Sequence, residues 1–577
     1  MVGKAAMDAA RPHHDRDRKG RISLKKRANL TPSVPIRLEG FAVFVLIVVV
    51  LVFFYDSLRT IYIFPVPDSY RWYGDETQTW MLLGWKNLLA HGRLTLPIAL
   101  GSTLEHAPGL LLGSSWVPAV IYGLPQLILS ADIDPITIGR TVTMCFALTT
   151  VVVMSWAGFR MRLPTAGVML SLALLLTTPS FTFASHSARY DMMTGFAIVT
   201  FVALFAVRIP LSAKRARPTR LFAFWLGLGS MFAALTISPH LLALLFLPAL
   251  YTAWYFGVLR TRNGIFSFLG GGAIAIAVLI GAYMAANQHV SIGGALFQHN
   301  QAGSYLSNLP IVHPFSWSAQ SHQLWAKGYY LSHEAMPFAV IFPLLLISSI
   351  LLLVFKRLNE QLIFVTLSLA GVVVGAIYFQ STLPYYLIHL LPLAALTLAV
   401  HLNAWRDELW MRPLIAAASL ALAAQLIFVS IPELRNAGRM GKRINEANTT
   451  AVQAAIEQES RVWQADLRKP LVLAQGPAVH ELLRNSTIRL MTESFLFFPE
   501  RDELPDSTIA REGVNYIIDY NRPMTTAYQA AVRTATPIFA RSGTLLDRTV
   551  DYFHDTTSEI DTLTLYQVTR NGPGENE

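Results

Sequence analysis

Apolar runs of about 20 residues recur along the central part of this 577-residue chain. A run of that length is what an α-helix needs to cross the hydrocarbon core of a bilayer. We therefore predict a polytopic α-helical membrane protein with about 11 spans. The runs are residues 40–56, 139–158, 165–184, 191–208, 221–238, 240–258, 265–285, 336–355, 361–379, 385–402 and 414–432.

The composition excludes an ordinary soluble protein. Hydrophobic residues make up 53% of the chain and charged residues 14%, whereas soluble domains carry about 25% charged residues. The single cysteine, Cys145, lies inside an apolar run, which excludes a disulfide framework and a cysteine-based metal site. The first apolar run is long enough to span and shows no cleavage signal, so we expect it to stay in the protein.

The net charge of +10 is distributed as in a membrane protein. Basic residues gather before the first span and in alternate short loops, for example at Arg160 and Arg162 and at Lys356 and Arg357. Because such loops face the cytosol, we expect a cytosolic N-terminus, a C-terminal tail outside, and contact with anionic membrane lipid. No basic face with interleaved aromatic residues is evident, so we expect no nucleic-acid partner.

One further apolar segment, residues 107–130, does not fit this alternation. A crossing there would turn every later basic loop outward, and the segment contains Pro108, Pro118 and Pro125. Proline breaks a helix interior, and irregular backbone is tolerated at membrane depth where protein or a watery cavity covers it. We predict a broken or re-entrant segment.

The chain is thereby divided into three parts. Residues 1–39 are a basic cytosolic segment, residues 40–432 a transmembrane catalytic domain, and residues 433–577 a domain outside the membrane. In the last part, "KPLVLAQ", "STIRLMT" and "GVNYIIDYN" are predicted strands, and "PAVHELLRN" is a predicted helix between the first two. We expect a small α/β fold there.

Two adjacent acids, Asp75 and Glu76, stand in the first outward loop, directly before a Trp- and Leu-rich segment at residues 77–91. Asp75 with Gln78 fits a capping box at the start of an interfacial helix. Capping does not require Glu76, nor the pair Glu105 and His106 at the far end of the loop. The alternative is that Asp75 is a general base acting on an alcohol or amine at the membrane surface.

Several motifs in order resemble the GT-C glycosyltransferases, and most nearly the protein O-mannosyltransferases and the lipid A aminoarabinose transferases. They are "DET" after the first span, "GRLTLPIALGSTLEHAPGLLLG", and the stretch from "IGRTVTMCFALTT" to "ARYDMMTGF". The resemblance covers roughly residues 40–402. It implies a GT-C fold and transfer of a sugar from a polyprenyl-phosphate donor to an acceptor outside the cytosol.

The resemblance also implies roles for individual residues. Asp75 matches the catalytic carboxylate, Glu76 its acidic neighbour, and Asp191 an outward-facing Asp beside the cavity. Glu105 and His299 match residues that share a divalent metal ion. His106 matches a position near the lipid phosphate.

The chain departs from the family pattern in its cations. Gln78 replaces an Arg that often follows the Asp-Glu-Thr motif, and Lys327 is the only Lys or Arg between Arg262 and Lys356. The cations available for the lipid phosphate are therefore His106, Arg189 and Lys327. Alternatively, Arg189 and Asp191 form a salt bridge at a membrane edge, and His299 is an ordinary loop histidine.

The leading hypothesis is a polyprenyl-phosphate-dependent glycosyltransferase of a bacterial inner membrane, acting on a glycan, lipid or protein outside it. A transporter or flippase for a lipid-linked or polar solute is the alternative, but it would be expected to show internal repeats and charges deep in several spans. For the C-terminal domain alone, a scaffold role stays open.

Overall fold

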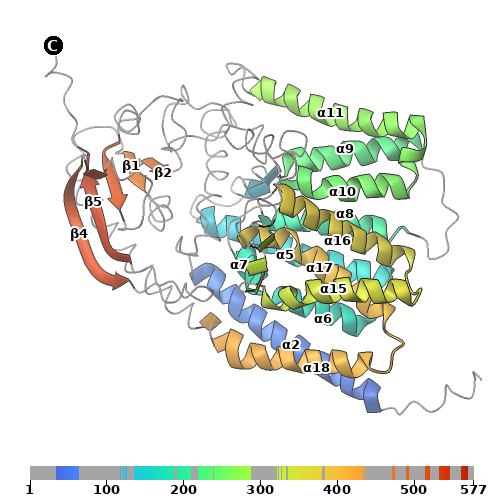
Figure 1. Cartoon of the computed structure of the whole chain (residues 1–577). Coiled ribbons are helices and arrows are strands. Elements are labelled where there is room, and N and C mark those ends of the chain that lie inside the picture. The colour runs from blue at the N-terminus through green and yellow to red at the C-terminus, as the bar shows by residue number, and fades with distance from the viewer. Residues whose placement is uncertain are drawn as a thin grey trace, which may run out of the picture.

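A computed structural model shows a bundle of membrane helices with a small β-sheet beyond one end (Figure 1). The structure describes residues 34–63, 117–118, 121–122, 124–125, 135–186, 191–209, 219–237, 240–286, 321, 324–325, 328–329, 331–332, 335–379, 384–432, 434–435, 471–474, 489–492, 514–519, 532–533, 535–545 and 560–568.

Each predicted apolar run contains a described helix. The helices are α2 (Val34–Ile63), α5 (Pro135–Arg160), α6 (Thr165–Leu176), α7 (Pro179–His186), α8 (Asp191–Ala206), α9 (Arg220–Thr236), α10 (His240–Tyr255), α11 (Arg262–Ala286), α15 (Met336–Val354), α16 (Glu360–Phe379), α17 (Leu391–Ala404) and α18 (Met411–Gln425). Short helical turns are η2 (Val258–Arg260), η3 (Pro384–His389) and η4 (Leu426–Ser430), the last a π-helical continuation of α18.

Among the described helices, 6 are long and apolar enough to cross a membrane by themselves, or 7 if the bent pair α6 and α7 is one span. Four shorter apolar helices lie at Asp191–Ala206, Arg220–Thr236, Leu244–Tyr255 and Leu391–Ala404. The multi-pass helical architecture is therefore confirmed, while the number of about 11 crossings stays a prediction.

The predicted span at 165–184 is bent, because α6 and α7 meet at an angle of 72°. Pro179 begins α7 and has no N–H to donate to the preceding turn. The hydroxyls of Thr177 and Thr178 donate to the carbonyls of Ala173 and Leu174, at 2.7 and 2.6 Å, and so satisfy the end of α6. The result is a sharp bend between two apolar helices.

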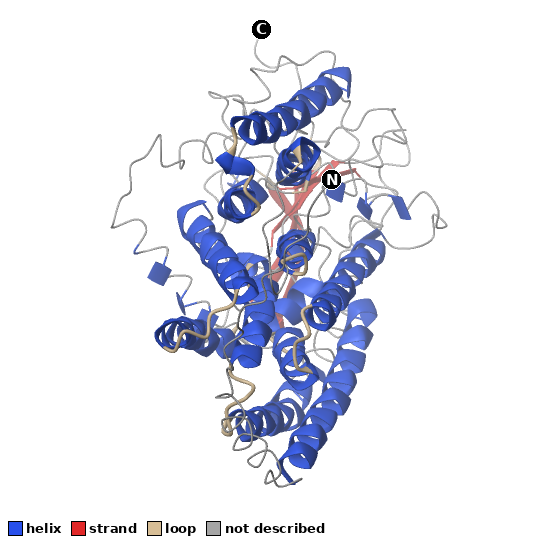
Figure 2. Ribbon diagram, turned by 90° about the vertical axis from the view of Figure 1, so that its right-hand side faces the viewer, coloured by secondary structure: helices blue, strands red, loops and turns tan. Residues whose placement is uncertain are grey.

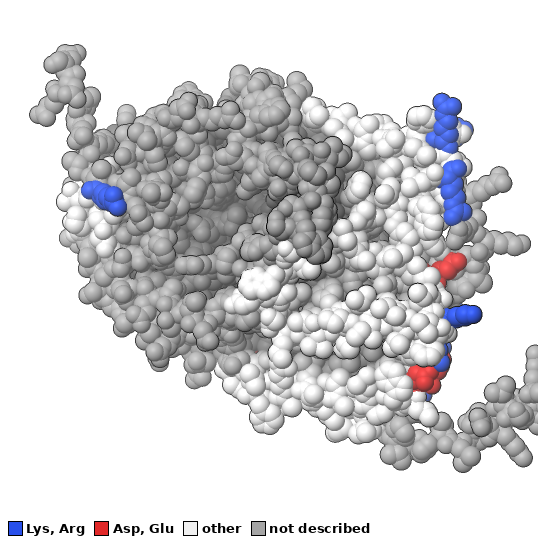
Figure 3. All heavy atoms as spheres, viewed as in Figure 1, with Lys and Arg blue, Asp and Glu red and all other residues white. Residues whose placement is uncertain are grey.

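Charged side chains of the described bundle gather at one of its ends. On the face seen in Figure 3, the charges of the described bundle lie along the edge remote from the sheet, and a broad uncharged band separates them from the opposite end. Large apolar side chains such as Phe159, Leu221 and Phe246 are exposed on the bundle. This is the surface expected of a protein embedded in lipid.

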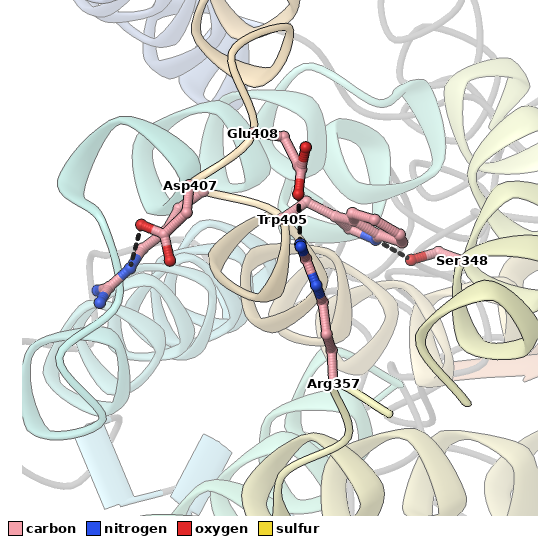
Figure 4. A network of polar contacts seen from close by, with 6 residues as sticks. Ser348, Arg357, Trp405, Asp407 and Glu408 are labelled. Atoms are coloured by element: carbon pink, nitrogen blue, oxygen red, sulfur yellow. Dashed lines mark hydrogen bonds and ion pairs between the residues drawn. The ribbon is translucent and has the colours of Figure 1, made fainter. Parts of the chain in front are cut away.

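A polar network ties three helices together at the end remote from the sheet (Figure 4). The hydroxyl of Ser348 in α15 accepts the Trp405 indole N–H at 2.8 Å and lies 2.8 Å from Nδ1 of the buried His401 in α17. Nε2 of His401 lies 3.1 Å from the Thr366 hydroxyl of α16. Arg357 binds Glu408 at 2.5 Å, closing the turns between these helices.

The tail forms a 5-stranded mixed sheet with the order β2-β1-β3-β5-β4, seen behind the helices in Figure 2. Its strands are β1 (Leu471–Ala474), β2 (Arg489–Thr492), β3 (Tyr516–Asp519), β4 (Thr536–Leu545) and β5 (Ile560–Gln567). β1 pairs in parallel with β2 and β3, whereas β5 is antiparallel to β3 and β4.

The three predicted strands coincide with β1, β2 and β3, and the predicted helix at 477–485 lies outside the described residues. β4 and β5 were not predicted. β4 contains Pro537 and Gly543 and is bulged at two places, which obscures the strand pattern. β5 does alternate, since Leu563 follows Thr562 and Leu565 follows Thr564, a signal that the strand prediction missed.

Candidate functional site

Most of the site residues expected from the sequence lie outside the described part of the chain. These are Asp75, Glu76, Glu105, His106, Arg189, His299 and Lys327. Their proposed roles therefore stay predictions. Asp191 is described, and the helix ends that carry the other loops are described as well.

Five of these helix ends meet at one end of the bundle, the end that faces the sheet. α2, α7 and η3 end there, and α5 and α8 begin there (Figure 1). Both α5 and η3 contact α7 and α8. The loop bearing Asp75 leaves from α2, and the segment bearing Arg189 leads into α8. Helix ends that are far apart in sequence are thus brought to one end of the bundle.

Asp191 is the first residue of α8, and its carboxylate is buried against a histidine. Asp191 Oδ1 lies 3.2 Å from Nε2 of His389, with side chains 2% and 0% exposed. An acid at this position also benefits from the positive end of the helix dipole. The ring of Tyr386 lies 5.4 Å from that of His389, so η3 presents an aromatic and an imidazole side by side.

A second buried histidine, His186, joins the end of α7 to the end of α2. Its Nε2 lies 2.8 Å from the carbonyl oxygen of Ser57 and is hydrogen-bonded to the Ser57 hydroxyl. Its Nδ1 lies 2.5 Å from the Thr182 carbonyl and 2.9 Å from the Ser185 hydroxyl. The guanidinium of Arg140 in α5, a residue 4% exposed, interacts with this ring electrostatically.

The end of α2 is also tied to the start of the tail. The Arg435 guanidinium donates from Nε and Nη2 to Oδ2 of Asp56, both at 2.7 Å. Asp56 is buried, whereas the Arg435 side chain is 56% exposed. The helix from which the Asp75 loop leaves is therefore fixed on two sides.

The segment predicted as broken or re-entrant contributes to the same end. Its described residues at 117–118, 121–122 and 124–125 are helical, and the buried Tyr122 hydroxyl lies 2.6 Å from the Thr143 hydroxyl of α5. Tyr122 and Met193 of α8 share a small apolar cluster. The rest of the segment is outside the described residues.

No group of three or more His, Cys, Asp or Glu that could hold a metal ion is present in the described part of the chain. Asp191 and His389 supply one carboxylate and one imidazole, fewer donors than a protein metal site ordinarily has. The expected metal ligands Glu105 and His299 are outside the described residues. A carboxylate and an imidazole together suit a transition-metal ion.

Four described residues of this end were not singled out in the sequence: Asp56, Arg140, His186 and His389. A charge near the end of an apolar run is a signal that Asp56 and Arg140 do carry. His389 lies in "LPYYLIHLLPL", where the aromatic residues suggest only a membrane-interface belt. Their grouping depends on helix packing, which the sequence does not state.

No protein-family model and no curated protein matches the chain. Two crystal structures of ArnT from Cupriavidus metallidurans are similar to it. The apo structure has a TM-score of 0.52 at 14% sequence identity and covers 90% of this chain and 97% of that chain. The structure bound to undecaprenyl phosphate has a TM-score of 0.51 at 14% identity and covers 91% of this chain and 98% of that chain.

At this level of identity the similarity establishes the fold. The chain has the GT-C fold of ArnT over nearly its whole length, with the C-terminal part included. The GT-C architecture expected from the sequence motifs is confirmed.

Proposed function

Starting from this shared fold, we propose that the chain is a membrane glycosyltransferase that uses a polyprenyl-phosphate sugar as its donor. The observation that carries the proposal is the fold match, since one of the two similar structures is bound to undecaprenyl phosphate. A second support is the group of helix ends that face the sheet, from which the Asp75 loop and the Arg189 segment both leave.

In the proposed reaction, Asp75 removes a proton from a hydroxyl or amine of the acceptor while that group attacks the anomeric carbon of the sugar. The bond from the anomeric carbon to the phosphate oxygen breaks, and the polyprenyl phosphate leaves with both bonding electrons. Glu76 tunes the neighbouring carboxylate. Asp191 lies beside the reacting groups.

The leaving phosphate requires positive charge in a site of low dielectric constant. We assign that role to His106, Arg189 and Lys327. A divalent metal ion on Glu105 and His299 would supply further charge stabilisation when bound. The roles of His106, Glu105 and His299 follow from the family resemblance, whereas Arg189 and Lys327 are assigned as the other cations available.

The described charges favour an enzyme over a transporter or flippase. In the bundle they lie near the ends of their helices, whereas a transporter would be expected to place several deep in its spans. The basic turns at Arg160, Arg260, Lys356 and Arg406 follow α5, α10, α15 and α17, at the helix ends remote from the sheet (Figure 1). We therefore place the N-terminus in the cytosol and the sheet on the outer face of an inner membrane.

The test is turnover of the purified protein with a panel of polyprenyl-phosphate sugars and envelope from a strain that lacks the protein. We expect release of polyprenyl phosphate, measured by mass spectrometry. Because Asn caps a helix about as well as Asp but is no base, Asp75→Asn should lower turnover by roughly a hundredfold or more at unchanged folding.

Several outcomes would count against the proposal. An Asp75→Asn variant as active as the wild type would show that Asp75 is only a cap. Full activity of the wild-type protein in chelator, with normal activity of Glu105→Ala and His299→Ala, would show that the reaction needs no metal ion at these residues. Movement of an intact lipid-linked sugar across proteoliposomes without bond cleavage would favour the flippase.

A further inference from the structure

We infer that His389 and Gly195 are positioning residues for the Asp191 carboxylate in the transfer reaction, an inference that rests on the proposed function. The sequence motifs point to Asp191 alone. The partner histidine and the glycine that brings it close are visible only in the packing of η3 against α8.

The pair is a buried contact between a carboxylate and an imidazole. Nε2 of His389 lies 3.2 Å from Oδ1 of Asp191. An ionised carboxylate has no proton of its own to donate, so an imidazole at this distance stabilises the negative charge when Nε2 carries the proton. Both side chains are almost fully buried, where an unpaired carboxylate is costly. His389 thereby stabilises the charge of the carboxylate, and its place on η3 sets the distance between the two groups.

Gly195 determines how closely the histidine can approach. It follows Asp191 by one helical turn and therefore lies on the same face of α8. A Cβ atom at this position would lie 2.6 Å from the backbone carbonyl oxygen of Ile388 and 3.6 Å from Cγ of Pro392. Because the close atom belongs to the backbone, no side-chain rotation can relieve the contact.

The His389–Asp191 contact and the close approach of Gly195 to Ile388 depend on each other. Ile388 immediately precedes His389, so a residue larger than glycine at position 195 would push away the part of η3 that carries the imidazole. The α8–η3 contact is extensive, and a displacement there would lengthen the distance from Nε2 to the carboxylate. A misplacement of about 1 Å can lower a reaction rate by roughly a hundredfold.

The pair could instead serve only the stability of the bundle, and kinetics separate the two roles. His389→Leu removes the donor, whereas His389→Gln keeps an amide N–H that can reach the carboxylate. Gly195→Ala tests the spacing. Its matched control is Gly270→Ala in α11, where an added Cβ meets nothing within 4 Å.

The experiment measures kcat and KM for the polyprenyl-phosphate sugar, using protein that elutes as a single species at equal amounts. We expect His389→Leu and Gly195→Ala to lower kcat at least about tenfold, with the KM for the donor changed less than about twofold, as expected for lost positioning. His389→Gln should keep a substantial part of the activity, and Gly270→Ala should equal the wild type.

Two results would overturn the inference while leaving the proposed function intact. One is normal kinetics in both His389→Leu and Gly195→Ala. The other is equal loss in His389→Leu and His389→Gln together with an equal loss of thermal stability, since that pattern belongs to a structural pair. A wild-type protein that releases no polyprenyl phosphate from any donor would overturn both.

Discussion

At the scale of single residues, the salt bridge between Asp56 and Arg435 joins two segments that are 379 positions apart in the sequence. Its two ends differ in burial, since Asp56 is 7% exposed and Arg435 is 56% exposed. Arg435→Ala leaves a buried carboxylate without its cation, whereas Asp56→Asn returns the guanidinium to water. We therefore expect Arg435→Ala to cost about 1–2 kcal/mol of unfolding free energy, a value below that of a fully buried pair, and Asp56→Asn to cost less than about 1 kcal/mol.

The measurement is unfolding of the purified protein in mixed micelles titrated with a denaturing detergent. Arg412→Ala is the matched control, because Arg412 lies 4.0 Å from Glu39 at the other end of α2 and is 46% exposed. Exposed pairs of this kind contribute little. If Asp56→Asn lowered the unfolding free energy more than Arg435→Ala, the buried carboxylate would not be the costly group to leave without its partner.

At the scale of elements, α9 and α11 approach each other through glycines on both helices. A Cβ on Gly227 would lie 1.9 Å from the Phe268 carbonyl oxygen, and one on Gly271 would lie 2.1 Å from that of Phe224. Small residues allow such backbone contact in a membrane, where apolar side chains gain little by leaving lipid. We expect Gly227→Ala to destabilise the protein by about 1–3 kcal/mol, the usual cost of overpacking.

Gly229→Ala on the same helix serves as the control, since an added Cβ there meets nothing within 4 Å. Alanine is the better helix former, so this variant should be neutral or slightly more stable. Both variants are compared by apparent unfolding temperature in the same detergent. Equal apparent unfolding temperatures of Gly227→Ala and Gly229→Ala would mean that the glycine contact does not stabilise the packing of α9 against α11.

At the scale of the whole molecule, the helices place the basic turns at one end of the bundle and the sheet beyond the other (Figures 1 and 3). If the basic end is cytosolic, Arg533→Cys before β4 should react with a membrane-impermeant maleimide in intact spheroplasts. Leu409→Cys, at a position 88% exposed in the turn between α17 and α18, should react only after permeabilisation.

Both cysteines are introduced in a protein with Cys145→Ala, because Cys145 is itself exposed. Labelling of both after permeabilisation confirms that each site is reactive. The reverse labelling pattern would show that the protein has the opposite orientation in the membrane. It would also move the proposed site to the cytosol, where nucleotide sugars are available, and so remove the reason for a lipid-linked donor.

The positions of the apolar helices, and the helix ends that carry basic charge, could be predicted from the sequence alone. Hydropathy is a local property, so the limits of α15 and α16 could be predicted to within about one residue. The short apolar runs that predict β1 to β3 are equally local. The motifs around Asp75 and Asp191 carried the resemblance to the GT-C fold.

The pairing of the helices, by contrast, emerges only in the folded protein. Lipid is as apolar as the side chains that face it, so hydropathy cannot distinguish a helix partner from the bilayer. Two kinds of contact do make the distinction. One is the close approach of a glycine to a backbone carbonyl of another segment, as at Gly195. The other is a buried polar pair, such as Asp191 with His389 or Ser57 with His186. Each depends on two segments far apart in sequence, because a buried polar group is stable in the membrane only where another segment supplies its partner.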